Sequence, residues 1–398
     1  MEDILDIDLL GSDSDDDLDD LLLYHVLNDN LGHRADLYGR FSLNAISEIE
    51  AKQSFRFEKR HIPRLAEALN IPDEITTREN ITLTGVQALC ILLRRLTYPN
   101  RLADLESFFG YSYAALSSII NTITQIVMAN KGHLLQRLGN NAWLNEEKLR
   151  QYSEELLWIM YGALSMVPSG QYVGLQLTKD RSQKGRTYSG HKRVHCVKYQ
   201  SLLCPDGIVV SLKGAYPGAR HDAGMFRESG LYEELEEFAV FGNRSYVIYG
   251  DQGYGLRQLL IRPFTQHEVA NNVNRQHFNN AMSSLRVSVE WGFNKIIKEF
   301  AFLDFKKNQK LLLQEVGTMY LVGMLLTNCH ICLYGSQQSS YFDIQPPVLE
   351  IYLGNYKCKN LNIKYCRVTC LTLLYALLRE PGAKSTIRVL PINFTYKV

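Results

Sequence analysis

One succession of segments in the second half of the chain restricts its fold more than any other feature. Two strand-like segments, Val194–Leu203 and Ile208–Leu212, are joined by Cys204–Gly207, in which an Asp-Gly pair is typical of a β-hairpin turn. Helical and strand patterns then alternate along the chain, at 222–238, 245–249, 281–300 and 310–332. Strands that alternate with helices are typical of α/β domains, so the sequence predicts this fold class.

The region before this domain, residues 47–150, predicts helices only. Two of them, Arg101–Phe109 and Tyr113–Val127, are separated by the short turn Gly110–Ser112. The second helix carries an apolar stripe with helical spacing, formed by Leu116, Ile119, Ile120 and Ile123. Two helices around a glycine turn are typical of a helix-turn-helix. A plain helical bundle gives the same pattern, so both interpretations stay open.

Charge is distributed very unevenly along the chain. The first 20 residues hold ten Asp or Glu and no Lys or Arg, whereas the other 378 hold 43 basic and 32 acidic residues. A low-complexity acidic run of this kind predicts a disordered arm, which we assign to residues 1–24. A basic body suits a polyanionic partner such as nucleic acid, and the acidic arm can compete for the same surface. A solvated tail on an ordinary protein is the alternative.

The composition excludes several classes of protein. With 46% hydrophobic and 21% charged residues, the chain is neither wholly disordered nor collagen-like. Its most apolar runs, Met319–Leu326 and Val368–Leu378, are shorter than the roughly 20 apolar residues that span a bilayer. No signal peptide opens the chain, and eight cysteines are too few for a disulfide scaffold. We therefore expect an intracellular protein that does not contact membranes.

Two carboxylates stand where an α/β domain concentrates chemistry. Asp251 follows a buried-type strand and precedes a glycine turn, which places it at the carboxyl end of that strand. Glu290 lies in the later helix beside the apolar stripe, with Arg286 one turn before it. Converging carboxylates bind Mg²⁺ or Mn²⁺, and such ions promote phosphodiester cleavage. The alternative is that Asp251 caps a turn and that Glu290 forms a surface pair with Arg286.

Five short motifs occur in order along the second half of the chain. They are Gly190–His195 (GHKRVH), Gly218–Met225 (GARHDAGM), Tyr249–Tyr254 (YGDQGY), Met282–Phe293 (MSSLRVSVEWGF) and Gln345–Leu349 (QPPVL). The first four closely resemble the catalytic domain of PIF/Harbinger-type DDE transposases, and the fifth resembles the end of that domain. The resemblance covers about residues 50–353.

This resemblance implies a ribonuclease H-like α/β fold, preceded by an all-helical, helix-turn-helix-like region. The implied activity is DNA endonuclease cleavage and strand transfer at transposon ends, with Mg²⁺ or Mn²⁺ as the cofactor. By motif, Asp251 is the second catalytic and metal-binding carboxylate and Glu290 is the third, whereas His221 and Asp222 support the site. We accordingly assign residues 160–353 to the DDE domain and leave 354–398 as an unassigned tail.

The first catalytic motif of the family, Ile-Asp-Gly-Thr on the opening strand, is missing. In its place stands the segment 161–174, which has no acidic residue and no convincing strand pattern and which Pro168 interrupts. Synonymous codons exist for 163–174 that, read from the third base of the preceding codon, encode Gly-Phe-Ile-Asp-Gly-Thr-Val-Arg-Pro-Ile-Cys-Arg. A frameshift over 163–174 is therefore our hypothesis, and the chain as given is expected to be catalytically impaired. A non-catalytic DNA- or protein-binding derivative is the alternative.

Basic residues near both predicted regions are expected to contact DNA. The exposed face of the helix after Gly110 has no Arg or Lys, so phosphate contacts are predicted instead. The residues concerned are Arg94, Arg95 and Arg101 in the helical region, and His191, Lys192, Arg193, His195 and Lys198 near the active site. For the second group, a solvated strand edge is the alternative. The resemblance further implies a Myb-like accessory protein that directs DNA targeting and nuclear entry. A nuclear homo-oligomer is therefore expected.

Overall fold

The computed structural model describes residues 39–156, 163–164, 171–174, 188–189, 194–242, 244–250, 254–270, 272–304 and 316–355. For strands β3, β4 and β5, and for residues 155–156, 194–196, 284–290 and 316, this description covers the backbone alone. The predicted arm 1–24 lies outside these residues, as does nearly all of the unassigned tail 354–398. All described residues belong to one compact unit, which ends at Asn355.

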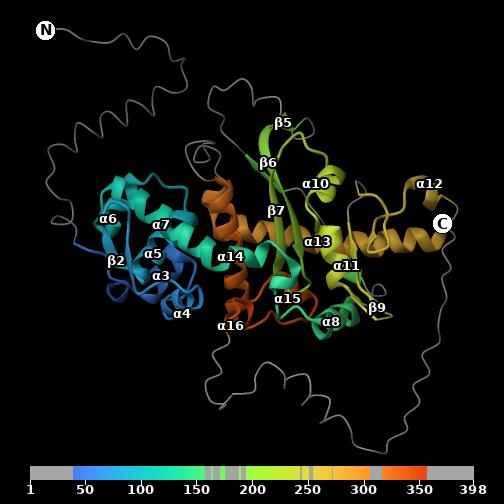
Figure 1. Ribbon diagram of the computed structural model, residues 1–398, viewed down its shortest axis with the longest axis horizontal. Coiled ribbons are helices and arrows are strands. Elements are labelled where there is room, and N and C mark those ends of the chain that lie inside the picture. The colour runs from blue at the N-terminus through green and yellow to red at the C-terminus, as the bar shows by residue number, and fades with distance from the viewer. Residues whose placement is uncertain are drawn as a thin grey trace, which may run out of the picture. The chain divides into compact units, whose positions relative to one another are not determined.

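The N-terminal region is mainly helical (Figure 1), but the prediction of helices only is wrong, because two short strands also pair antiparallel there. Its elements are the α-helices α3 (Glu48–Phe55), α4 (His61–Ala68), α5 (Gly85–Thr97), α6 (Glu106–Phe109), α7 (Tyr113–Lys131) and α8 (Glu146–Leu156), the strands β1 (Glu74–Thr76) and β2 (Thr82–Thr84), and the 3-10 turns η1 (Leu43–Ala45), η2 (Ala103–Leu105), η3 (Gly132–Leu135) and η4 (Leu138–Asn140). Thr84 and Gln87 form a capping box that starts α5. The predicted apolar stripe of α7 is buried, which confirms its inward face.

The predicted β-hairpin is present and longer than expected. Strand β6 (Val194–Leu203) pairs antiparallel with β7 (Val209–Pro217), and Leu202 lies opposite Ser211. Gly207 takes φ 92°, a conformation that favours glycine, so the Asp-Gly turn signal is confirmed. Strands β4 (Gln171–Gly174) and β5 (Tyr188–Ser189) also pair antiparallel with β6.

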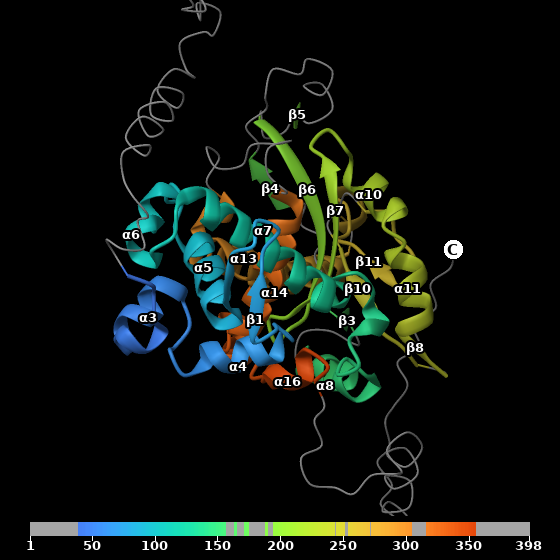
Figure 2. The same ribbon diagram turned by 60° about the vertical axis from the view of Figure 1, so that its left-hand side comes forward.

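A second, parallel group of strands contains the short apolar strand of the sequence prediction. Strand β10 (Val247–Tyr249) lies between β3 (Ala163–Leu164) and β11 (Leu260–Ile261) and is parallel to both (Figure 2). The segment 163–174 thus contributes β3 to this group and β4 to the antiparallel group. The expectation that this segment contains no strand is wrong. Backbone pairing needs N–H and C=O groups rather than particular side chains, and neighbouring strands supply both.

Helices complete the domain on either side of the strands. They are α10 (Asp222–Glu228), α11 (Leu231–Phe238), α12 (Gln266–Val269), α13 (Val273–Glu299), α14 (Val316–Tyr334), α15 (Gln337–Tyr341) and α16 (Leu349–Tyr352), with the 3-10 turn η5 (Ala301–Asp304) and the small strands β8 (Val240–Phe241) and β9 (Arg244–Ser245). The single helix predicted over 222–238 is divided, because Gly230 takes a left-handed conformation between α10 and α11. Helix α13 begins eight residues earlier than predicted, where Asn272 caps it.

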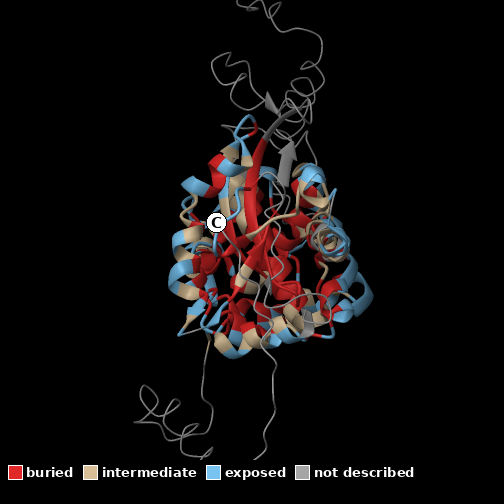
Figure 3. Cartoon of the chain, turned by 90° about the vertical axis from the view of Figure 1, so that its right-hand side faces the viewer, coloured by how far each residue is buried: buried red, intermediate tan, exposed pale blue. Residues whose placement is uncertain are grey.

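Helix α14 is central to the core. It packs against α7 of the N-terminal region and against β7, α13 and α16 of the strand-containing region. Tyr320 stacks on Tyr199 of β6, with ring centroids 4.6 Å apart. Asn328 bonds both backbone groups of Val209: its side-chain oxygen accepts from the N–H at 3.0 Å and its amide donates to the C=O at 2.8 Å. Buried residues accordingly gather in the interior, on the strands and on the inner parts of the helices (Figure 3).

None of the helices in the described ranges combines the length and the apolar character that crossing a membrane requires.

Candidate functional site

Strand β10 brings the chain to the predicted position of the second carboxylate. Ile248 and Tyr249 are each 1% exposed, so the strand is buried as its apolar sequence predicts. Gly250 ends it, and its N–H donates to the carbonyl of Ile261 at 2.8 Å. A Cβ on Gly250 would approach Leu260 to 3.0 Å, which leaves little room for a larger residue. Asp251 is the next residue and itself lies outside the described residues.

The register of β3 and β10 shows at which edge of the sheet each strand ends. Ala163 lies opposite Val247 and Leu164 lies opposite Ile248 in a parallel pair. The carboxyl ends of parallel strands meet at one edge of a sheet. The chain that follows Leu164 and the chain that follows Tyr249 therefore start from the same edge.

Helix α13 carries Glu290 and is held close to the hairpin. A Cβ on Gly292 would lie 2.9 Å from Leu203 of β6 and 3.1 Å from the side chain of Gln338, so only glycine permits this approach without a shift. Ile296, one turn later, is fully buried. The helix backbone includes Glu290, but the side chain of Glu290 lies outside what the structure describes. The structure thus locates the helix and leaves the predicted convergence with Asp251 as a prediction.

The predicted supporting pair, His221 and Asp222, lies at the start of α10. His221 is exposed, and Asp222 is the first helical residue. Lys198 of β6 is only 7% exposed, and its Nζ lies 3.4 Å from Asp222 Oδ1 and donates to the Arg220 carbonyl at 2.8 Å. The structure therefore directs Lys198 inward to this turn, in place of the phosphate contact expected from its sequence position. Asp222 is paired with a buried cation, which sequence spacing does not reveal.

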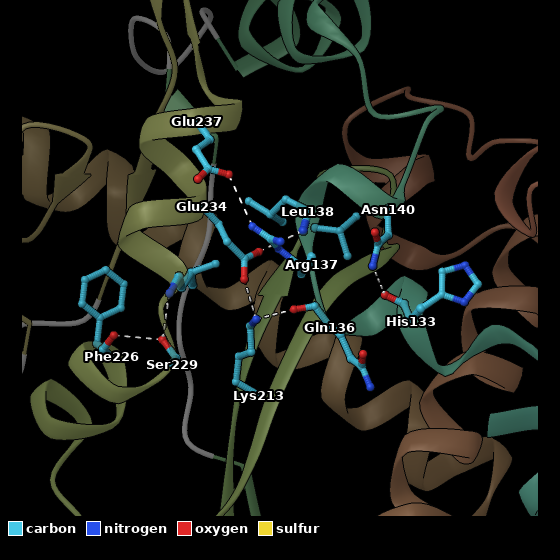
Figure 4. A network of polar contacts seen from close by, with 12 residues as sticks. His133, Gln136, Arg137, Leu138, Asn140, Lys213, Phe226, Ser229, Glu234 and Glu237 are labelled. Atoms are coloured by element: carbon cyan, nitrogen blue, oxygen red, sulfur yellow. Dashed lines mark hydrogen bonds and ion pairs between the residues drawn. The ribbon is translucent and has the colours of Figure 1, made fainter. Parts of the chain in front are cut away.

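A polar network ties the hairpin and α11 to the segment after α7 (Figure 4). Lys213 of β7 pairs with Glu234 of α11, with Nζ and Oε1 2.6 Å apart, and also donates to the carbonyl of Gln136. The other oxygen of Glu234 accepts from the N–H of Leu138 at 2.9 Å. The Lys213 and Glu234 side chains are 16% and 11% exposed, so solvent screens this pair only weakly. No pattern in the sequence indicates this pair.

The hairpin turn contains a buried carboxyl group. Asp206 is fully buried, and its two oxygens accept from Tyr152 Oη at 2.5 Å and from the Ile208 N–H at 3.1 Å. Burial raises the pKa of Asp206 to about 6, although both hydrogen bonds oppose the shift. Ser336 also donates to its carbonyl, at 3.1 Å. The Asp-Gly pattern predicts the turn, but nothing in the local sequence predicts that the carboxyl is enclosed.

The three arginines predicted to contact phosphate in the helical region differ in accessibility. Arg95 is 6% exposed, donates to the Asn100 carbonyl and lies 4.1 Å from the ring centre of Phe302. Burial lowers the pKa of Arg95 to about 10. Arg94 is half-buried on aromatic rings, and Arg101 is exposed. Arg95 is thus enclosed in the fold, whereas the other two retain exposed surface. Lys192 and Arg193 lie outside the described residues.

No group of three or more His, Cys, Asp or Glu side chains that can hold a metal ion is found among the described residues. The residues that the structure places here therefore do not by themselves make a metal centre. Both predicted ligands, Asp251 and Glu290, have side chains outside that set. The divalent ion remains an expectation from sequence.

Comparison with known proteins gives one positive result. No curated protein and no solved structure matches the chain. A family model does match, over about two-fifths of the chain. The matched range includes Asp222, Asp251 and Glu290. It begins after the segment 163–169, where the first carboxylate motif is missing. Residues 170–328 are thus similar to the DDE superfamily endonucleases.

Proposed function

We propose that the chain is a transposase-derived protein of the PIF/Harbinger type, with a DDE domain built to cleave and transfer DNA strands. The observation that carries this proposal is the parallel pairing of β3 with β10. Because of this pairing, the chain leaves β3 after Leu164 and leaves β10 just before Asp251 at the same edge of the sheet. That edge is where an α/β sheet gathers catalytic groups. The similarity of residues 170–328 to DDE superfamily endonucleases supports the same conclusion.

The strand arrangement supports the expected ribonuclease H-like fold. In that fold the opening strand is central and carries the first carboxylate. The two described parts of the segment 163–174 pair with both groups of strands, β3 with β10 and β4 with β6, which supports a position for this segment between the two groups. The helical region before it is proposed to act as the helix-turn-helix-like part, in which α6, Gly110 and α7 follow the predicted order.

The proposed active site consists of Asp251 and Glu290, with His221 and Asp222 as supporting residues. DDE superfamily endonucleases generally use divalent metals, and such ions supply water activation and stabilisation of the leaving oxygen when bound. Lys198 donates to the Arg220 carbonyl and so holds the backbone of the His221–Asp222 turn in place. In this proposal, the turn orients the groups of the active site. DNA, a Myb-like accessory protein, homo-oligomer formation and a nuclear location belong to the same proposal.

The chain as given lacks the first carboxylate, so we propose that it is catalytically impaired. The segment 163–170 contains no acidic residue, although β3 delivers the backbone to the expected edge. A shifted reading frame over 163–174 accounts for this combination of a retained strand position and a missing side chain. The absence of the acid also favours the second candidate function, that of a non-catalytic DNA- or protein-binding derivative.

Restoring the motif tests both functions. In the repaired chain, residues 163–174 are replaced by Gly-Phe-Ile-Asp-Gly-Thr-Val-Arg-Pro-Ile-Cys-Arg, and nicking of supercoiled DNA is measured with and without Mn²⁺. We expect Mn²⁺-dependent nicking by the repaired chain, its loss in repaired Asp251→Asn and its retention in repaired Asp304→Asn, which changes an exposed carboxylate elsewhere. Binding without nicking in every variant would support the binding derivative instead.

Sequencing the transcript and the genomic DNA across codons 160–180 tests the frameshift separately. An in-frame Ile-Asp-Gly-Thr would restore the full set of carboxylates. A message that encodes 163–174 as printed would leave the chain with two of them.

A further inference from the structure

Two arginines share one tyrosine ring in the N-terminal region. The guanidinium carbon of Arg56 lies 5.1 Å from the ring centre of Tyr98, and that of Arg94 lies 4.5 Å from it. Arg56 caps the end of α3 and Tyr98 caps the end of α5, while Arg94 comes from the last turn of α5. We call Arg56, Tyr98 and Arg94 the arginine–tyrosine cluster. Arginine over an aromatic ring keeps its N–H groups available for anions.

The positive charge of this cluster is not balanced by a neighbouring acid. Within the described ranges no carboxylate forms an ion pair with Arg56 or Arg94, and Arg56 Nε donates instead to a main-chain carbonyl, that of Glu299, at 3.3 Å. Arg94 Nε is buried and has no hydrogen-bond partner. Burial lowers the pKa of Arg94, Tyr98 opposes this shift, and the charge of Arg56 adds to it. Arg64, by contrast, binds both carboxylate oxygens of Glu350.

The described chain begins beside this cluster. Phe41 stacks on Phe108 with ring centres 5.5 Å apart, and Arg94 lies 5.7 Å from the centre of that same Phe108 ring. The point at which the preceding chain is attached therefore lies within a few side chains of the cluster. About 19 residues separate Asp20 from Gly39, and a chain of that length spans at most roughly 60 Å.

We propose that the arginine–tyrosine cluster is a binding site for the carboxylates of an acidic peptide, and that its occupant is the chain's own segment Met1–Asp20. Ten acidic residues and no basic ones make this segment complementary to two uncompensated guanidinium groups. The tether holds it at an effective concentration on the order of millimolar, which an untethered competitor must exceed.

Binding of a free peptide to the full-length chain tests the proposal. The probe is a fluorescent peptide with the sequence of Met1–Asp20, and the protein is a neutral-arm chain, in which the ten acidic residues of that segment are Asn or Gln. We expect salt-sensitive binding by fluorescence anisotropy, weakened roughly tenfold in neutral-arm Arg56→Gln/Arg94→Gln. Neutral-arm Arg60→Gln/Arg78→Gln removes the same charge from exposed positions of the same region and should bind as the parent does.

A comparison without any change in the cluster guards against misfolding of the double variant. The unaltered chain should bind the same peptide roughly tenfold more weakly than the neutral-arm chain, because its own arm occupies the site. Equal affinity of these two proteins, or equal loss in both double variants, contradicts the proposal. So does a duplex oligonucleotide that binds through Arg56 and Arg94 when the peptide does not. None of these readouts involves DNA cleavage, so they are independent of the proposed nuclease activity.

Discussion

The β6–β7 hairpin and the segment 163–174 meet where β4 pairs with β6, and they invite a comparison of side-chain packing with backbone pairing. The hairpin is held by its turn, by buried side chains on β6 and by polar contacts along β7. What the structure describes of the segment is backbone pairing at its two ends, Ala163–Leu164 and Gln171–Gly174. A hairpin with buried polar contacts depends on particular residues, whereas we predict that the segment is held mainly through the backbone pairing of its two ends.

The largest effect is expected from the buried face of the hairpin. Leu202 is fully buried and lines a small apolar cavity with Leu138, Leu235 and Ile248. Leu202→Ala should lower the free energy of unfolding by about 2–5 kcal/mol, because it enlarges a void that already exists. Urea denaturation measures this loss. A loss below about 1 kcal/mol would mean that the hairpin depends on its side chains no more than the segment does.

The turn of the hairpin should give the next largest effect. Asp206→Ala removes the acceptor of the Ile208 N–H and deprives the buried Tyr152 hydroxyl of its carboxylate partner. The expected cost is about 2–3 kcal/mol, measured by the same denaturation. Tyr152→Phe, which removes one of the two contacts, is the matched control and should cost about 1 kcal/mol. Equal costs would show that the turn is held by Tyr152 alone.

The same carboxyl predicts a pH dependence that the segment does not share. Because the pKa of Asp206 rises from 3.8 to about 6 on folding, the folded protein retains a proton that the unfolded chain releases. The free energy of unfolding should therefore fall as the pH rises from about 4 to about 6. Asp206 accounts for at most about 1.4 kcal/mol of this fall per pH unit. Asp206→Asn keeps the acceptor for the Ile208 N–H and should flatten this part of the curve. An unchanged slope would assign the dependence to other groups.

Polar contacts along β7 should contribute less. Glu234→Gln weakens the enclosed pair with Lys213 and should cost about 1–2 kcal/mol. Glu237→Gln, on the same helix, affects the exposed pair with Arg137, whose side chains are 62% and 72% exposed, and should cost less than about 0.5 kcal/mol. Thermal unfolding at low and high salt distinguishes the two, because salt should affect only the exposed pair.

The smallest effect is expected in the segment itself. Val173 pairs with Val197 through the backbone, which alanine leaves intact. Val173→Ala should therefore cost less than about 1 kcal/mol, whereas Val173→Pro removes a backbone donor from the strand and should cost more. Hydrogen exchange of the β6 amides measures the local change. A large loss in the alanine variant would show that side chains hold this strand as firmly as they hold the hairpin.

Local signals made the hairpin, the helical region and β10 predictable from sequence. The Asp-Gly turn, the stripe of α7 and the apolar run before Gly250 each occupy a few adjacent residues. Strands β3 and β4 were not predictable in this way, because their partners lie 84 and 28 residues away at Val247 and Tyr199. Single-sequence patterns carry little information about such pairing.

The candidate site shows the same difference between features that local sequence signals predict and features that depend on contacts between distant elements. Asp251 and Glu290 follow from strand ends, helix spacing and family motifs, and their convergence stays a prediction. The pairing of Lys198 with Asp222, the enclosure of Asp206 and the burial of Arg95 come from contacts between elements. Charge and residue type alone indicate none of them, because they do not show whether a side chain faces solvent.

The two hydrogen bonds between Asn328 and Val209 have a consequence for solubility. Among the described strands, β7 pairs only with β6, so its other edge is a potential template for a strand from another molecule. At Val209 the side-chain amide of Asn328 satisfies both the N–H and the C=O that an incoming strand would use. A helix residue thus imitates a neighbouring strand at this point, and the edge is closed there against the intermolecular pairing that leads to aggregation.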